Sequence, residues 1–114
     1  MIPTIFKKEY SSLFTEYGHG VTTIDHILHS IGYDLTNLHT DEAREKGLEV
    51  IYQLLKYKIV KITFLNGENV KDNQFKLYEK MYLIEKLWNK GEADFENIVN
   101  FALKDWYYKK LFIF

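Results

Sequence analysis

The chain has no cysteine, one proline, six glycines and no long hydrophobic run. Without cysteine it can form no disulfide, no thiolate metal site and no cysteine nucleophile. Small secreted domains usually depend on such cross-links, so we expect a cytoplasmic protein. The N-terminal sequence MIPTIFKKEYSS lacks the apolar core of a signal peptide, and no segment approaches the roughly 20 apolar residues of a membrane span.

Aromatic residues, in contrast, are abundant: they make up 17% of the 114 residues, and hydrophobic residues make up 46%. This composition predicts one folded domain over residues 1–114. The net charge is −1, which disfavours a general nucleic-acid binder. Residues 1–50 carry a net charge of −4 and residues 51–114 carry +3. The first half could therefore present an acidic surface to a basic partner.

Helical spacing of apolar residues dominates the chain. The clearest amphipathic pattern is Ile24, Ile27, Leu28 and Ile31. Thr40 is a predicted N-cap for the helix that follows, in which Gly47 would let another helix approach. The predicted helices span residues 4–17, 24–31, 41–58, 73–90 and 94–110.

One segment, residues 59–65, alternates β-branched or aromatic residues with polar ones and predicts a strand closed by an Asn66-Gly67 turn. A strand needs a partner, and ENVKDNQF directly after the turn is a poor candidate. The C-terminal KKLFIF is a better one, unless it extends the last helix. The predicted fold class is therefore mainly α: a single domain of about five helices with a minor β element near 59–65.

Three of the four histidines lie between residues 18 and 29, as His19, His26 and His29. His26 and His29 share a helix face, but the zinc-protease pattern H-E-x-x-H is missing. We interpret the stretch as a turn and a short helix with histidines at its border. No serine lies in a G-x-S-x-G motif and no phosphate-binding loop is present. The sequence thus predicts no enzyme, no metal and no cofactor.

Nine tyrosines exceed what a core this small can bury with every hydroxyl satisfied. Tyr is enriched at interface hot spots, and several tyrosines lie beside carboxylates in the acidic half. The predicted partner-binding residues are Glu16, Tyr17, Asp25, Tyr33, Asp34, Asp41, Glu42 and Glu45.

A second hypothesis starts from clustered lysines. The predicted helix, strand and turn across residues 41–67 faintly resemble part of a winged helix. Lysines interleaved with tyrosines are suited to binding single-stranded nucleic acid, whose bases stack on the aromatic rings. The helix that would read nucleic acid nevertheless begins TDEAREKGLE, which is acidic. A small nucleic-acid-binding regulator of winged-helix-like type is therefore the alternative. It would use Lys56, Lys58, Lys61, Lys109 and Lys110.

The stretch GLEVIYQLLKYKIVKITFLNGE, followed by a long helix and DWYY, resembles immunity proteins of bacterial polymorphic-toxin and contact-dependent inhibition systems. The likeness covers roughly residues 45–110 and is one of layout, so it transfers no functional residue. It implies a small cytoplasmic protein that neutralises a cognate toxin by occluding its active site or an adjacent surface. The implied partner is a protein toxin, for which a nuclease domain is one candidate.

Overall fold

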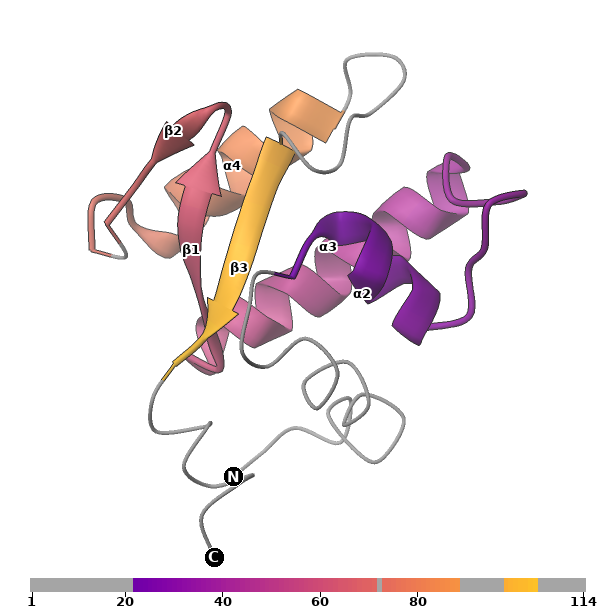
Figure 1. Cartoon of the computed structure of the whole chain (residues 1–114), viewed down its shortest axis with the longest axis horizontal. Coiled ribbons are helices and arrows are strands. Elements are labelled where there is room, and N and C mark those ends of the chain that lie inside the picture. The colour runs from indigo at the N-terminus through magenta and orange to yellow at the C-terminus, as the bar shows by residue number, and fades with distance from the viewer. Residues whose placement is uncertain (1–21, 72, 89–97, 105–114) are drawn as a thin grey trace, which may run out of the picture.

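Three helices and three strands make up the part of the chain that the structure, a computed structural model, describes: residues 22–71, 73–88 and 98–104 (Figure 1). The predicted helix at 4–17 lies outside these residues. The elements follow one another as α2 (Ile24–Ser30), α3 (Asp41–Lys56), β1 (Val60–Leu65), β2 (Glu68–Asn69), α4 (Leu77–Trp88) and β3 (Val99–Leu103).

The strands form an antiparallel sheet in the order β2-β1-β3. β1 confirms the predicted strand, and the predicted Asn66-Gly67 turn joins it to β2, with φ angles of 50° and 85°. Two consecutive positive φ angles twist the chain as a two-residue hairpin requires. β1 pairs with β3 from Val60↔Leu103 to Leu65↔Val99, with a register shift between Ile62 and Phe64.

The prediction of a mainly α fold with five helices is wrong: the described residues form a mixed fold of three helices and a three-stranded antiparallel sheet. Within the predicted helix at 94–110, Val99–Leu103 is a strand. Its apolar residues satisfy both periods, since Ile98, Val99 and Ala102 fit a helix while Val99 and Phe101 alternate as in a strand. Pairing with β1 decides between them, and local spacing does not contain that long-range contact.

The partners of β1 also differ from the expectation. β3 occupies one edge and β2 the other, and β2 belongs to the segment that looked too polar to pair. It succeeds because a tight turn places it directly beside β1, and two residues suffice to close the hairpin. The alternative partner KKLFIF lies outside the described residues.

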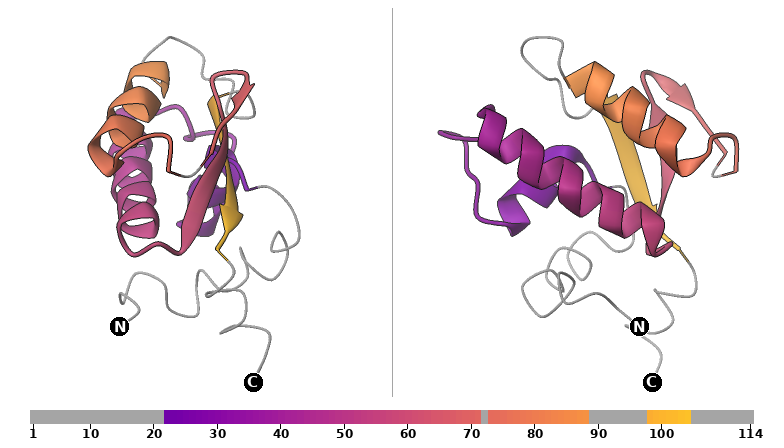
Figure 2. Two further views of the ribbon diagram at one scale, coloured as in Figure 1. Left: turned by 90° about the vertical axis from the view of Figure 1, so that its left-hand side faces the viewer. Right: turned by 180° about the vertical axis from the view of Figure 1, so that it is seen from behind.

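α3 and α4 lie side by side over one face of the sheet, and α2 lies against α3 near the β3 edge (Figure 2). There Thr22 pairs with Phe101 through two backbone hydrogen bonds of 2.8 Å. The core fills the space between helices and sheet. Its largest fully buried side chains are Phe101, Ile24, Ile27, Leu28, Ile51, Leu54, Ile59, Ile62, Ile84 and Val99.

The helix boundaries follow from local chemistry. Thr40 caps α3 as predicted, because its Oγ1 accepts the Ala43 N–H at 3.2 Å. α4 begins at Leu77, later than expected, and the Glu79 carboxylate accepts the Lys76 N–H at 3.0 Å. No helix in the described part of the chain is long and apolar enough to cross a membrane.

Candidate functional site

The connection between α2 and α3, residues 31–40, is a hydrogen-bonded turn centred on Asp34. The Thr36 N–H donates to Asp34 Oδ1 at 2.8 Å, and the Thr36 hydroxyl donates to the same oxygen. In return, Asn37 Oδ1 accepts the Asp34 N–H at 2.7 Å. The Asp34 carbonyl accepts the N–H groups of Asn37 and Leu38 at 3.1 and 2.9 Å. One aspartate therefore fixes the backbone of the turn through both its side chain and its main chain.

Leu35 projects from this turn with 83% of its surface exposed, whereas Leu38 is 4% exposed and belongs to the core. Burial of Leu38 anchors one side of the turn, and the Asp34 hydrogen bonds hold the other, so that Leu35 is held out in solvent. Leu35 is not among the predicted partner-binding residues. Two leucines three residues apart in YDLTNLHT gave no sign of which one turns inward.

Carboxylates from the start of α3 accompany this leucine in the chain. Asp41, Glu42 and Glu45 are all exposed, and Arg44 lies 3.9 Å from Asp41 as an i,i+3 ion pair. The Tyr33 hydroxyl donates to Glu42 Oε1 at 3.3 Å, which ties the beginning of the turn to α3. Five predicted residues thus lie in the turn and the first two turns of α3, which the Tyr33–Glu42 hydrogen bond joins. Together with Leu35 we call them the acidic edge: Tyr33, Asp34, Leu35, Asp41, Glu42 and Glu45.

Two groups in the acidic edge have shifted pKa values. Hydrogen bonds from the Thr36 hydroxyl and N–H lower the pKa of Asp34, and the nearby His29 adds to the effect. Asp34 therefore keeps its charge to lower pH and is a weaker base than an ordinary aspartate. Desolvation and the neighbouring Glu42 raise the pKa of Tyr33, so its hydroxyl stays protonated as a donor.

The other predicted partner-binding residues are not part of the acidic edge. Asp25 is half-buried in the first turn of α2, at the opposite end of that helix from the turn, where it accepts a hydrogen bond from the Thr23 hydroxyl. The prediction that Asp25 contributes to the same face is therefore not supported by its position. Glu16 and Tyr17 lie outside the described residues.

The histidine stretch forms the predicted short helix with histidines at its border. Ile24, Ile27 and Leu28 are buried, His26 is half-buried and His29 is exposed. His26 Nδ1 lies 3.3 Å from the Thr23 hydroxyl. Within the described ranges, no three His, Asp or Glu side chains gather as a metal site would require. His19 lies outside these ranges.

The lysines of the alternative hypothesis lie around the junction of α3 and β1. Lys56 Nζ is 5.6 Å from the ring centroid of Tyr52 and 5.7 Å from that of Tyr57, a cation–π arrangement with both rings partly exposed. Lys58 adopts a positive φ of 56° between the two elements, and Lys61 is half-buried on β1. Lys109 and Lys110 lie outside the described residues.

No protein-family model, no curated protein and no solved structure matches this chain. The chemistry of the acidic edge must therefore be judged from its own geometry. Its carboxylates are solvated, and the pKa of Asp34 is lowered, whereas proton transfer near neutral pH requires a raised carboxyl pKa in a water-shielded cleft. An exposed leucine next to fixed negative charge is instead suited to binding another protein.

Proposed function

We propose that the chain is a stoichiometric immunity protein that binds a cognate bacterial toxin in the cytoplasm and occludes its active site or an adjacent surface. It acts by binding and catalyses no reaction. The observation that carries the proposal is Leu35, which is 83% exposed on a turn that hydrogen bonds hold in place and that leads into the acidic start of α3. The partner surface would be basic and would offer a small apolar pocket.

Leu35 can add to the affinity for a partner that covers it. Complete burial of a leucine side chain contributes about 1.5–3 kcal/mol. Because Asp34 already orders the turn, association does not have to pay for ordering the loop. Negative charge in the first half would accelerate the encounter with a basic partner, and the buried leucine would slow dissociation.

The resemblance in layout gives separate support. The order on which it rests, a helix followed by a short strand, a turn and a second long helix, is present as α3, β1, the Asn66-Gly67 turn and α4. Loss of the fifth helix from the expected fold leaves this order unchanged. The DWYY segment of the resemblance lies outside the described residues.

Affinity capture from the native cells tests the proposal, with the tagged chain used with and without nuclease treatment. We expect one equimolar protein partner that survives nuclease and is lost when the bait carries Leu35→Ser. Tyr82→Ser is the matched control, because Tyr82 is 63% exposed on α4, outside the acidic edge. The purified partner should be toxic when expressed alone and should be inhibited at a 1:1 ratio by the wild-type chain.

Charge reversal provides a second, kinetic test of the same interface. Asp41→Lys, Glu42→Lys and Glu45→Lys should each lower the association rate, and high salt should lower the wild-type rate in the same way. An association rate that responds to neither salt nor reversal would place the interface elsewhere. A captured protein that the chain does not inhibit would reject the immunity function itself.

The alternative is a small nucleic-acid-binding regulator of winged-helix-like type, and the position of Lys56 between Tyr52 and Tyr57 favours it. For such a protein, the capture eluate would contain nucleic acid, and the captured partners would be lost on nuclease digestion. Its affinity would fall steeply with salt, because lysines displace counterions from phosphates. The exposed side of α3 also carries Glu42, Glu45 and Glu49, which is why we rank this function second.

A further inference from the structure

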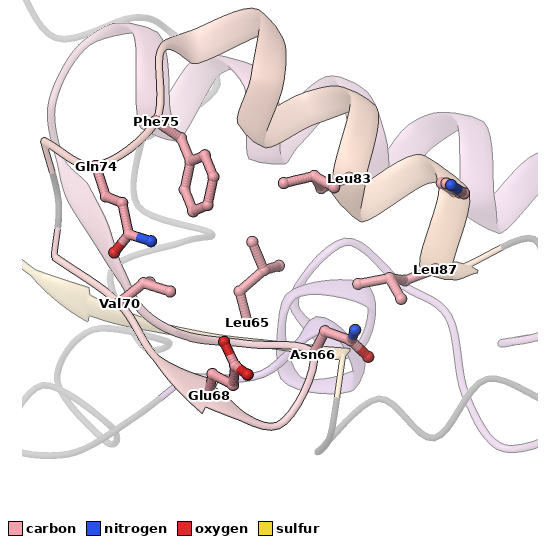
Figure 3. A pocket seen from close by; sticks show the side chains of 9 residues that line it. Leu65, Asn66, Glu68, Val70, Gln74, Phe75, Leu83 and Leu87 are labelled. Carbon is pink, nitrogen blue, oxygen red and sulfur yellow. The ribbon is translucent and has the colours of Figure 1, made fainter.

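A cavity of about 250 Å³ lies between the β1–β2 hairpin, the residues Val70, Gln74 and Phe75, and α4. Figure 3 shows Leu65, Val70 and Phe75 on one wall and Leu83 and Leu87 on the facing helix. Leu65 is buried, and the other four apolar side chains are half-buried. The β1–β2 hairpin, which contributes to the lining, and the α2–α3 connection lie on different sides of the molecule (Figure 1).

Polar side chains stand among this apolar lining. Glu68 comes from β2 and Lys86 from α4, and Asn66 and Gln74 complete the polar part of the lining. No ion pair joins Glu68 and Lys86 in the described part of the chain. Lys86 Nζ lies instead 5.9 Å from the ring centroid of Tyr82. Glu68 and Lys86 are both exposed, so the cavity has a carboxylate side chain at its rim on the β2 side and a lysine side chain at its rim on the α4 side.

We propose that this cavity binds a small apolar zwitterion, either a free apolar amino acid or a short apolar peptide. At about 250 Å³ the cavity exceeds the roughly 150 Å³ that suffices to hold a benzene ring, so it has room for one bulky aliphatic or aromatic side chain. The side chain would replace poorly held water against Phe75, Leu83 and Leu87. Glu68 would accept hydrogen bonds from the ligand ammonium group, and Lys86 would donate to its carboxylate.

This arrangement explains the chemistry of the lining better than a purely apolar ligand would. Two opposite charges on separate walls would attract two opposite charges on one molecule, whereas an uncharged ligand would form no charge-assisted hydrogen bond with either side chain. The ammonium and carboxylate groups are further apart in a peptide than in a free amino acid. Because the two charges of the cavity come from different walls, the two kinds of ligand should therefore bind with different affinities. The proposal concerns a surface distinct from the acidic edge and does not depend on the immunity function.

A titration of the ¹⁵N-labelled full chain with small probes, followed by NMR, tests the proposal. The probes are L-phenylalanine and L-leucyl-L-leucine, with phenethylamine lacking the carboxylate, 3-phenylpropionate lacking the ammonium group, and glycine lacking the side chain. We expect saturable shifts at Leu65, Leu83 and Leu87 with a zwitterionic apolar probe, and an affinity about tenfold lower when either charge is missing. Tighter binding of L-phenylalanine would indicate a free amino acid as the ligand, and tighter binding of L-leucyl-L-leucine would indicate a short peptide.

Two variants assign the charges. Glu68→Gln should lower the affinity for L-phenylalanine about tenfold and leave the affinity for 3-phenylpropionate unchanged. Lys86→Met should likewise lower the affinity for L-phenylalanine about tenfold, but leave the affinity for phenethylamine unchanged. Glu85→Gln, at an exposed position of α4 that does not line the cavity, is the matched control and should change no affinity. The proposal fails if no probe shifts cavity resonances at millimolar concentration, or if Glu68→Gln and Lys86→Met bind every probe as the wild type does.

Discussion

Gly47→Ala tests the contact on which the arrangement of the helices depends. A Cβ atom at Gly47 would lie 2.6 Å from Trp88 Cη2 and 2.9 Å from Leu28 Cδ2, so Trp88 from α4 and Leu28 from α2 both meet α3 at this residue. Carbon atoms pack comfortably at about 3.5–4.0 Å, so the indole ring would have to retreat by roughly 1 Å. Trp88 is 5% exposed and Leu28 is fully buried, so neither can move without disturbing the core.

Two opposing effects decide the magnitude. Alanine in a helix interior is more favourable than glycine by about 1 kcal/mol. Overpacking a well-packed core costs about 1–3 kcal/mol. The clash should therefore win, and Gly47→Ala should lower the free energy of unfolding by about 1 kcal/mol. Urea unfolding followed by far-UV circular dichroism measures this value without depending on tryptophan fluorescence.

A double-mutant cycle with Trp88→Phe isolates the cause. Phenylalanine lacks the outer ring atoms that the new Cβ would meet, so Gly47→Ala should cost much less in that background, with a coupling energy of about 1 kcal/mol. Strictly additive effects would show that Trp88 is not the obstacle. A stabilisation by the full propensity gain in the wild-type background would refute the close approach of the helices.

Three further predictions address the site, the hairpin and the core. In a carboxyl NMR titration, the pKa of Asp34 should lie below the ordinary aspartate range, and Thr36→Val should raise it. The stabilisation that the Thr36–Asp34 hydrogen bonds contribute is present above the ordinary carboxyl pKa and is lost as pH falls through the lowered value. An unchanged pKa in Thr36→Val would contradict the assigned cause. Gly67→Ala should cost about 1 kcal/mol in urea unfolding through backbone strain alone, since φ is 85° and nothing lies within 4 Å of the new Cβ; a neutral result would mean that the turn relaxes. Phe101→Ala should cost about 3–5 kcal/mol, because this side chain on β3 is fully buried in the core, and a loss below 1 kcal/mol would rule out that burial.

Local signals in the sequence predicted those parts of the fold that local interactions determine. The Thr40 cap and the Asn66-Gly67 turn occur where their chemistry indicated, and Gly47 receives the helix that its missing side chain admits. Val99–Leu103 was mistaken for a helix because its identity as a strand depends on β1, which precedes it by more than thirty residues. A two-residue strand such as Glu68–Asn69 has too few residues to produce any period at all.

The sequence predicted the charged residues of the candidate site but not its exposed leucine, Leu35. Acidic residues at a helix start can be recognised in a sequence, because they follow from capping and the helix dipole. Exposure of Leu35 cannot, since it depends on Asp34 binding Thr36 and Asn37 while Leu38 turns into the core. The cavity likewise combines residues from β1, β2, α4 and the intervening segment, which no single stretch of sequence brings together.

The acidic edge is built from the α2–α3 connection and the start of α3, whereas the cavity is lined by the β1–β2 hairpin, the residues after it and α4; Gly47 and Trp88 belong to neither set of residues. This separation makes the stability prediction useful for the binding experiments. Gly47→Ala alters no residue of either surface, so it should weaken toxin capture and zwitterion binding only in proportion to the unfolded fraction. With a loss of about 1 kcal/mol against a typical stability of 5–15 kcal/mol, that fraction stays small, and both affinities should be unchanged. Variants at Leu35 or Glu68 should show the reverse, with binding lost and the unfolding midpoint retained, so a variant that loses both would signal damage to the fold instead of to a site.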